Sequence, residues 1–124
     1  MLRGVVKSGL GEGSFFMGLK PYQKAMRIML GFPPYKGTLN LQADKGEAEK
    51  FIQTLEKTTI PGFTMGTKTF GEVHCYPCKL KDEKCAIAIP KFTRYDLSTV
   101  EVIARSHLRT KFELKDGEEV TLTR

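Results

Sequence analysis

Apolar and polar positions along this chain alternate in some segments and follow a helical period in others. Residues 2–7 and 14–19 are short apolar-rich runs typical of strands. Residues 38–42 alternate polar and apolar, which is the period of a half-buried strand. From residue 58 onward β-like runs dominate. We expect strands there over residues 58–64, 69–80, 84–89, 99–104 and 119–123.

Two segments have apolar residues spaced for one face of a helix. The first has apolar positions from Tyr22 to Leu30, with Pro21 just inside the start of the helix and Gly31 just past its end, as at natural helix ends. We expect its methionine-rich face to pack into the core. The second helix should start near Asp44, with Glu47 three residues on as in a capping box. Its apolar face would be Ala48, Phe51, Ile52 and Leu55.

The connections complete a mainly-β pattern. Residues 31–37 are a turn-rich loop, residues 81–84 a hairpin tip and residues 115–118 a tight turn, with a short helical turn before it over 108–112. Many short strands with two or three short helices predict a small closed β-barrel, because closure removes exposed strand edges. A chain of 124 residues is the size of one domain, so we expect residues 1–124 to form a single barrel domain.

The net charge of the chain indicates which classes of binding partner suit it. Lysine and arginine total 20 against 14 acidic residues, a net charge of +6, which suits nucleic acid, nucleotides or phosphorylated metabolites. The basic residues are scattered, so an ordinary solvated surface is the alternative. The apolar run at the N-terminus is too short for a signal peptide, and no segment approaches a membrane span of about 20 apolar residues. We expect a cytoplasmic protein with no membrane partner.

The three cysteines form no disulfide framework. Cys75 and Cys78 have C-x-x-C spacing after His74, but a structural zinc site needs four ligands and no second pair exists. The segment also reads as a strand, whereas a thioredoxin-like motif needs a helix after its first cysteine. We therefore favour buried apolar cysteines, with a zinc or redox role as the alternative.

The glycine-rich segment Gly9-Leu10-Gly11-Glu12-Gly13 is the first candidate for chemistry. It is neither a Walker A loop nor a dinucleotide fingerprint, since Gly13 is followed by Ser14 and Phe15. Alternate glycines let several backbone N–H groups turn toward one phosphate. A tight turn between strands uses glycine equally well, so both interpretations stay open at this point.

Polar residues on two predicted strands are further candidates. Thr38 and Asn40 lie two residues apart and so face the same side of a strand, offering neutral oxygen ligands suited to Mg²⁺ when a nucleotide supplies the negative charge. A solvent-facing polar edge is the alternative. Glu101 interrupts an apolar strand, where it could face water, bind a substrate hydroxyl or act as a general base.

Together these motifs resemble the archaeal CTP-dependent riboflavin kinases, nearly end to end. The matching fragments are Ser8 to Gly13 with Phe15-Phe16, Pro21-Tyr22, Gly31-Phe32 with Pro34-Tyr35, Gly37 to Leu41, Ile89-Pro90-Lys91 with Thr93, Leu108-Arg109 and Leu114 to Gly117. Each fragment is weak alone, and their order in one short chain makes the resemblance specific. Two positions depart from the pattern: Tyr95 stands where a histidine is often found, and Arg105 replaces a proline.

The resemblance implies a six-stranded cradle-loop barrel that transfers the γ-phosphate of CTP to the ribityl 5′-hydroxyl of riboflavin, giving FMN and CDP. It implies an enzyme that uses Mg²⁺ held by Thr38 and Asn40, with Thr93 and Glu101 on the flavin side, and Glu101 is the candidate base. A closed barrel of this size can be a monomer, which we expect here. The implied nucleotide-binding residues are Leu10, Gly11, Glu12, Gly13, Ser14, Phe15, Ser106, His107, Leu108 and Arg109.

A DNA-binding barrel of the swapped-hairpin type is the alternative. The segment from Leu108 to Val120 is similar to the C-terminal part of such modules, and the net charge permits it. These modules are usually shorter, however, and need neither the glycine-rich segment nor Thr38 and Asn40. We therefore expect no nucleic-acid partner.

Overall fold

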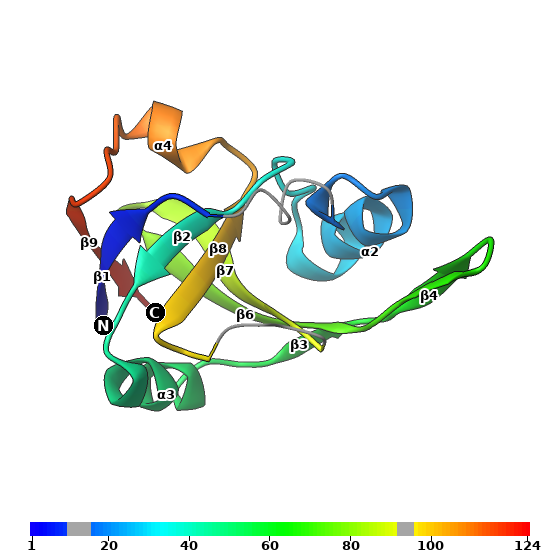
Figure 1. Ribbon diagram of the computed structural model, residues 1–124, viewed down its shortest axis with the longest axis horizontal. Coiled ribbons are helices and arrows are strands. Elements are labelled where there is room, and N and C mark those ends of the chain that lie inside the picture. Colours follow the sequence, from blue (N-terminus) through cyan, green and yellow to red (C-terminus); the bar gives the residue numbers. More distant parts are fainter. Residues whose placement is uncertain (10–15, 92–95) are drawn as a thin grey trace.

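The computed structural model describes residues 1–9, 16–91 and 96–124 (Figure 1). The strands are β1 (Leu2–Lys7), β2 (Leu39–Gln42), β3 (Thr58–Ile60), β4 (Phe63–Met65), β5 (Lys68–Phe70), β6 (Val73–Leu80), β7 (Glu83–Pro90), β8 (Thr99–Ala104) and β9 (Glu119–Thr123). The helices are α2 (Lys20–Leu30), α3 (Lys45–Gln53) and α4 (Leu108–Lys111).

Six of these strands close into a barrel. Their order is β6-β7-β8-β2-β1-β9, every pairing is antiparallel, and β9 returns to pair with β6. The long strand β6 makes closure possible, because residues 79–80 pair with β9 while residues 73–75 pair with β3. The prediction of a mainly-β, six-stranded closed barrel with short helices is confirmed.

Alternation along the strands separates two cores. One face of each strand fills the barrel interior, as Leu41 on β2 and Val102 on β8 illustrate with 0% and 1% exposure. Ile103 lies next to Val102 and therefore faces the other way, into a second core on the outer side. Tyr22 and Met26 of α2 pack into this outer core. The predicted core role of α2 is thus confirmed for these residues, whereas Met29 is 46% exposed.

The helices occupy distinct places around the barrel, with α3 and α4 at opposite ends in the view of Figure 1 and α2 beside it. Asp44 caps α3 as predicted, its carboxylate accepting from the backbone N–H of Glu47 at 2.9 Å. Helix α2 ends at Gly31, whose φ of 84° is a left-handed conformation that glycine adopts without strain. None of the helices in the described ranges is long and apolar enough to cross a membrane.

One strand prediction is wrong. In the predicted strand over residues 14–19, Phe16 and Met17 are helical and lead into α2. Met17 is 2% exposed and packs into the outer core, and its carbonyl accepts a hydrogen bond from the Gln23 side chain. Tertiary packing of the methionine therefore outweighs the strand preference of the aromatic pair.

The long strand predictions at residues 58–64 and 69–80 are each split in two. Pro61 and Gly62 follow β3, after which β4 and β5 form a separate two-stranded hairpin that projects from the barrel (Figure 1). Phe63 and Phe70 stack at its base with ring centroids 4.9 Å apart. Proline cannot donate to a strand ladder, which explains the break.

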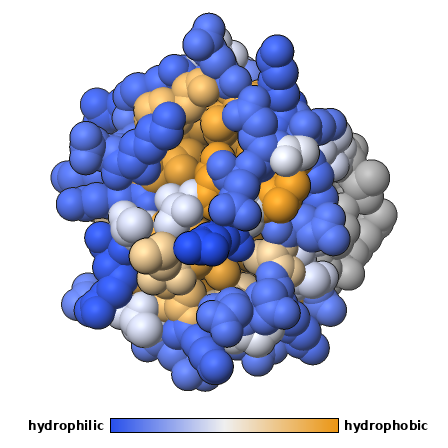
Figure 2. All heavy atoms as spheres, turned by 90° about the vertical axis from the view of Figure 1, so that its left-hand side faces the viewer, coloured by the Kyte–Doolittle hydropathy of each residue, from blue (hydrophilic) through white to orange (hydrophobic). Residues whose placement is uncertain are grey.

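The surface around the two termini combines hydrophilic residues with apolar gaps. Figure 2 shows this side, where hydrophobic surface is visible between hydrophilic side chains. Met1 and Val5 are exposed by 76% and 38%.

Candidate active site

The outer faces of β1, β2 and β8 carry a row of polar residues. Asn40 on β2 is paired in register with Lys7 on β1 and with Glu101 on β8. Directly paired residues share one face of a sheet, so these side chains lie next to one another. The Thr38 hydroxyl lies 3.4 Å from Asn40 Oδ1. The fold therefore brings together Thr38, Asn40 and Glu101, which sequence reasoning selected on separate segments.

The start of the glycine-rich segment lies against this row. A Cβ atom at Gly9 would come within 2.1 Å of Asn40 Nδ2, so only glycine allows this approach without a shift. The segment thus leaves β1 directly beside Asn40. Leu10, Gly11, Glu12, Gly13, Ser14 and Phe15 lie outside the described residues, and their phosphate contacts stay a prediction.

A hollow at the α4 end of the barrel contains the other predicted nucleotide-binding residues. Its lining consists of Tyr35, Gly37, Thr38, Leu39, Val102, Ala104, Ser106, His107, Leu108 and Arg109. Leu108 is 3% exposed and belongs to the barrel core, so it anchors this wall. The hollow therefore contains the candidate metal ligand Thr38 together with the predicted nucleotide segment, which is residues 106–109.

An aromatic pair stands at this hollow. The rings of Tyr35 and His107 are stacked with centroids 4.6 Å apart and an interplanar angle of 22°. Backbone hydrogen bonding fixes Tyr35, whose N–H donates to the Ala104 carbonyl at 2.6 Å. His107 Nδ1 lies 2.7 Å from the Thr110 hydroxyl. Such a stacked pair offers a flat surface to a planar ligand.

Two carboxylates hold the α4 segment on either side. Glu83 on β7 accepts from the Ser106 hydroxyl at 3.2 Å and forms an ion pair with Lys111. The Lys111 hydrogen bond is the main reason that the pKa of Glu83 is lowered. Asp116 pairs with Arg109 at 2.7 Å on the other side. These contacts orient the segment that faces the hollow.

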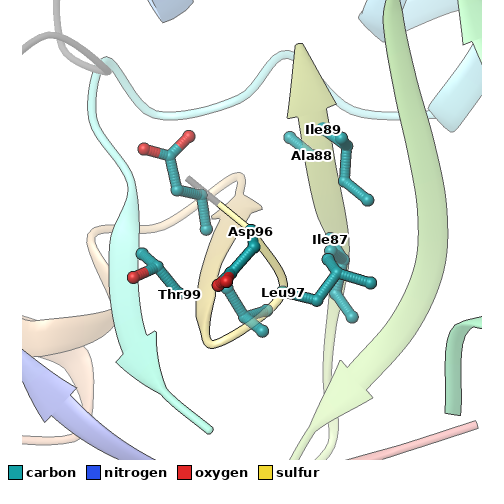
Figure 3. Close-up of a pocket in the computed structure, with 8 residues that line it drawn as sticks. Ile87, Ala88, Ile89, Asp96, Leu97 and Thr99 are labelled. Carbon is teal, nitrogen blue, oxygen red and sulfur yellow. The ribbon is translucent and has the colours of Figure 1, made fainter. Parts of the chain in front are cut away.

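A second hollow opens beside the polar row (Figure 3). Ile87, Ala88, Ile89 and Leu97 form apolar walls, and Asp96, Thr99, Val100 and Glu101 complete the lining. The ammonium group of Lys7 donates to the Thr99 hydroxyl at 2.7 Å. Figure 3 shows Thr99 and the three labelled β7 residues on opposite sides of Asp96. Thr93 lies outside the described residues, so its predicted place on the flavin side stays untested.

The family model of the CTP-dependent riboflavin kinases, described as a domain of unknown function, DUF120, matches residues 6–123. The chain belongs to this family. The resemblance that the motifs indicated is therefore confirmed.

Curated relatives agree with this family membership. The chain is 43% identical over 124 residues to a protein named riboflavin kinase from Methanospirillum hungatei, covering 98% of this chain and 56% of that protein. Riboflavin kinases from Archaeoglobus fulgidus and Pyrobaculum islandicum are 43% and 41% identical over 122 and 123 residues, covering 96% and 98% of this chain and 52% and 58% of those proteins. The chain thus spans little more than half the length of these relatives.

The cysteines of this family member are buried, as predicted. Cys75 packs in the outer core and Cys78 in the barrel interior, because residues three apart on a strand face opposite sides. Burial raises the pKa of the Cys75 thiol to about 12. Within the described ranges no three histidine, cysteine or acidic side chains gather as a metal site.

Sequence reasoning missed Tyr35, Asp96 and Asp116 as site residues. Tyr35 and Asp116 occur in fragments that resemble the riboflavin kinase family, yet neither had an assigned role. Tyr35 gains its importance from the ring of His107, which directly precedes α4, and Asp116 from the side chains of Ser8, 108 residues away, and Arg109. No local sequence pattern signals such pairings.

Proposed function

We propose that this protein transfers the γ-phosphate of CTP to the ribityl 5′-hydroxyl of riboflavin, giving FMN and CDP, and that residues 1–124 act as one catalytic domain. Its family membership supports this. One observation carries the proposal: Thr38, Asn40 and Glu101 lie in one row of polar residues between two hollows. Thr38 lines the hollow that contains the nucleotide segment, and Glu101 lines the hollow with apolar walls.

The first hollow would bind the nucleotide. Phosphoryl transfer passes through a loose transition state, so an enzyme contributes mainly by positioning and by neutralising phosphate charge. Arg109 supplies a fixed positive charge, and the backbone around Gly9 begins the segment whose N–H groups would wrap the phosphates. The stacked ring of Tyr35 or His107 would give the base a flat partner.

Thr38 and Asn40 are suited to holding Mg²⁺. Adjacent ligands in an octahedral magnesium site lie about 3 Å apart, since each bond is about 2.1 Å long. The Thr38 and Asn40 oxygens are 3.4 Å apart and need only a small adjustment. Bound there, Mg²⁺ would supply positive charge to the phosphate oxygens. Both protein ligands are neutral, so the negative charge of the site would come from the nucleotide.

Glu101 would act on the acceptor hydroxyl. In this proposal its carboxylate accepts the hydroxyl proton as the oxygen forms a bond to the γ-phosphorus. The bond from that phosphorus to the bridging oxygen breaks, and CDP leaves with the electron pair. The position of Glu101, paired with Asn40 and lining the second hollow, suits a group that acts between donor and acceptor.

The second hollow would receive riboflavin. Apolar walls from Ile87, Ile89 and Leu97 match the planar ring system, and Thr99 and Glu101 offer hydrogen-bond partners to a ribityl chain. Thr93 is proposed as a further flavin contact on the strength of the resemblance.

A nucleotide panel tests the function. The protein is incubated with riboflavin, Mg²⁺ and each of CTP, ATP, GTP and UTP in turn, and FMN is quantified by chromatography. FMN formation with CTP well above the other donors is expected. If none of the four nucleotides gives FMN, the kinase assignment is rejected. If FMN forms with another nucleotide and not with CTP, the choice of CTP as donor is rejected. Salt-sensitive retention of duplex DNA without FMN would favour the DNA-binding alternative.

A further inference from the structure

Asp116 connects two segments that are far apart in the chain. One carboxylate oxygen, Oδ2, accepts from the Ser8 hydroxyl at 2.8 Å, and Oδ1 accepts from Arg109 Nη1 at 2.7 Å. Ser8 stands at the exit of β1, immediately before Gly9. Arg109 belongs to α4 and lines the proposed nucleotide hollow. A single carboxylate therefore ties the start of the glycine-rich segment to the arginine.

The turn that carries Asp116 is fixed to the barrel. The backbone N–H of Gly117 donates to the Val6 carbonyl at 2.8 Å, and the Val6 N–H donates to the Glu118 carbonyl at 2.8 Å. Both bonds are made by the two residues that directly follow Asp116, and they dock the turn onto β1. Bonds from Ser8 and Arg109 also lower the pKa of the Asp116 carboxyl, so it stays ionised near neutral pH. A charged group on such a support can orient its partners.

The geometry of the ion pair leaves Arg109 able to bind phosphate. An arginine has five N–H donors, and the bond to Asp116 uses one of them. A carboxylate that competed with phosphate for the Arg109 guanidinium would be expected to bind it through both carboxylate oxygens, because this bidentate pair is the strongest arginine–carboxylate arrangement. Here the second carboxylate oxygen serves Ser8 instead.

We propose that Asp116 is a positioning residue that sets Arg109 and the Ser8 end of the glycine-rich segment for binding the phosphates of the nucleotide. This inference rests on the proposed function, because it assigns Asp116 to the nucleotide side of the same site. Asp116 acts through Arg109 and Ser8 and makes no contact with the reacting atoms.

Three variants separate positioning from general charge effects. Asp116→Asn keeps the size and removes the charge, and Asp116→Glu keeps the charge with a longer side chain. Glu118→Gln is the matched control, since it removes one negative charge from the same turn, where the exposed Glu118 side chain accepts from the backbone N–H of Lys115. CTP affinity is measured by calorimetry with Mg²⁺, and KM for CTP and kcat are measured from FMN formation.

For Asp116→Asn we expect CTP affinity to fall about tenfold to 100-fold, the equivalent of one hydrogen bond to a charged group. KM for CTP should rise more than kcat falls, because the lost contact acts on binding. Asp116→Glu should recover part of the affinity, and Glu118→Gln should match the unmodified protein. Unchanged or tighter CTP binding in Asp116→Asn, while the unmodified protein makes FMN, would overturn the role of Asp116 and leave the proposed function intact.

If no donor yields FMN, the proposed function is rejected. The role of Asp116 can still be tested then by a measurement without nucleotide. The side-chain Nε–Hε resonance of Arg109 is followed by NMR. We expect a well-dispersed signal in the unmodified protein and in Glu118→Gln. In Asp116→Asn the signal should collapse toward the position of free arginine. An unchanged Arg109 signal in that variant would contradict positioning by Asp116.

Discussion

At the scale of single residues, Asn40 lies beside several residues with candidate chemistry. Thr38 lies within 3.4 Å of it, Lys7 and Glu101 flank it across two strand pairings, and Gly9 approaches its amide. The residue types could be selected from the sequence, since a threonine and an asparagine two apart on a strand share one face. Their proximity to Glu101 depends on the pairing of β2 with β8, which no local pattern encodes.

Glu101→Gln tests the base at this scale. Replacing the carboxylate by an amide removes the proton acceptor while keeping the shape, so we expect kcat to fall roughly 100-fold or more. Riboflavin affinity, measured by flavin fluorescence titration, should change less than about twofold. Glu119→Gln, exposed on β9, is the control for loss of one negative charge. An unchanged kcat would rule out the base role.

Thr38→Ala combined with Asn40→Ala tests the metal ligands. The Mg²⁺ concentration for half-maximal FMN formation should rise at least about tenfold, as metal sites lose that much affinity even when only supporting contacts are removed. Gln42→Ala is the matched control, because Gln42 follows Asn40 on the same face of β2 and is exposed. An unaltered Mg²⁺ titration in the double variant would reject these ligands.

At the scale of elements, the placement of α4 depends on side chains from elsewhere. Its sequence predicted the helical turn, and the helix is found at Leu108–Lys111. Helices this short are marginal alone. Leu108 in the barrel core, Glu83 on β7 and Asp116 in the following turn hold it in position.

Glu83→Gln tests this support through its pH dependence. The pKa of Glu83 is lowered from 4.5 in the folded protein, by Lys111 first and with contributions from Ser106 and Arg105. Ionised Glu83 therefore favours folding above pH 4.5, and this contribution disappears as the pH falls through the lowered pKa. We expect Glu83→Gln to cost about 1 kcal/mol near pH 7 and less near pH 3.

The comparison is made by urea unfolding at both pH values. Asp82→Asn, in the same hairpin turn, serves as the charge control because it is exposed. A stability difference for Glu83→Gln that stayed constant with pH would mean that its charge does not stabilise the fold.

For the whole molecule, closure of the barrel is the decisive feature. Leu122 on β9 is 0% exposed and pairs in register with Leu2 of β1 and Leu80 of β6, so it lies where the first, last and central segments of the chain meet. The turn before β9 is hydrogen-bonded to Val6 on β1, and it follows α4 in the chain. This pairing therefore places the end of β1 near α4. The site therefore depends on closure.

Leu122→Ala should destabilise the protein by about 2–5 kcal/mol, because the lost side chain leaves a cavity in the closed core. Chemical unfolding followed by circular dichroism measures the change. Thr123→Ala is the control, since Thr123 is exposed on the same strand and pairs with Lys79, and it should cost less than about 1 kcal/mol. Equal effects of the two variants would contradict closure through Leu122.

The sequence by itself determined the elements whose cause is local. Pro21 and Gly31 bound α2, Asp44 caps α3, and the alternation around Leu39 and Leu41 marks β2, because capping, backbone preference and burial period act over a few residues. Phe16 and Met17 are one exception, where packing against α2 replaced the predicted strand.

Only the tertiary structure decided which candidate residues meet. Barrel closure and strand register bring Asn40 beside Glu101, and the turn before β9 brings Asp116 to Ser8 and Arg109. The Asn40–Glu101 and Ser8–Asp116 contacts join segments separated by much of the chain, and they form because burying both cores selects one register. The chemical groups were therefore readable along the sequence, whereas their assembly into a site required the folded barrel.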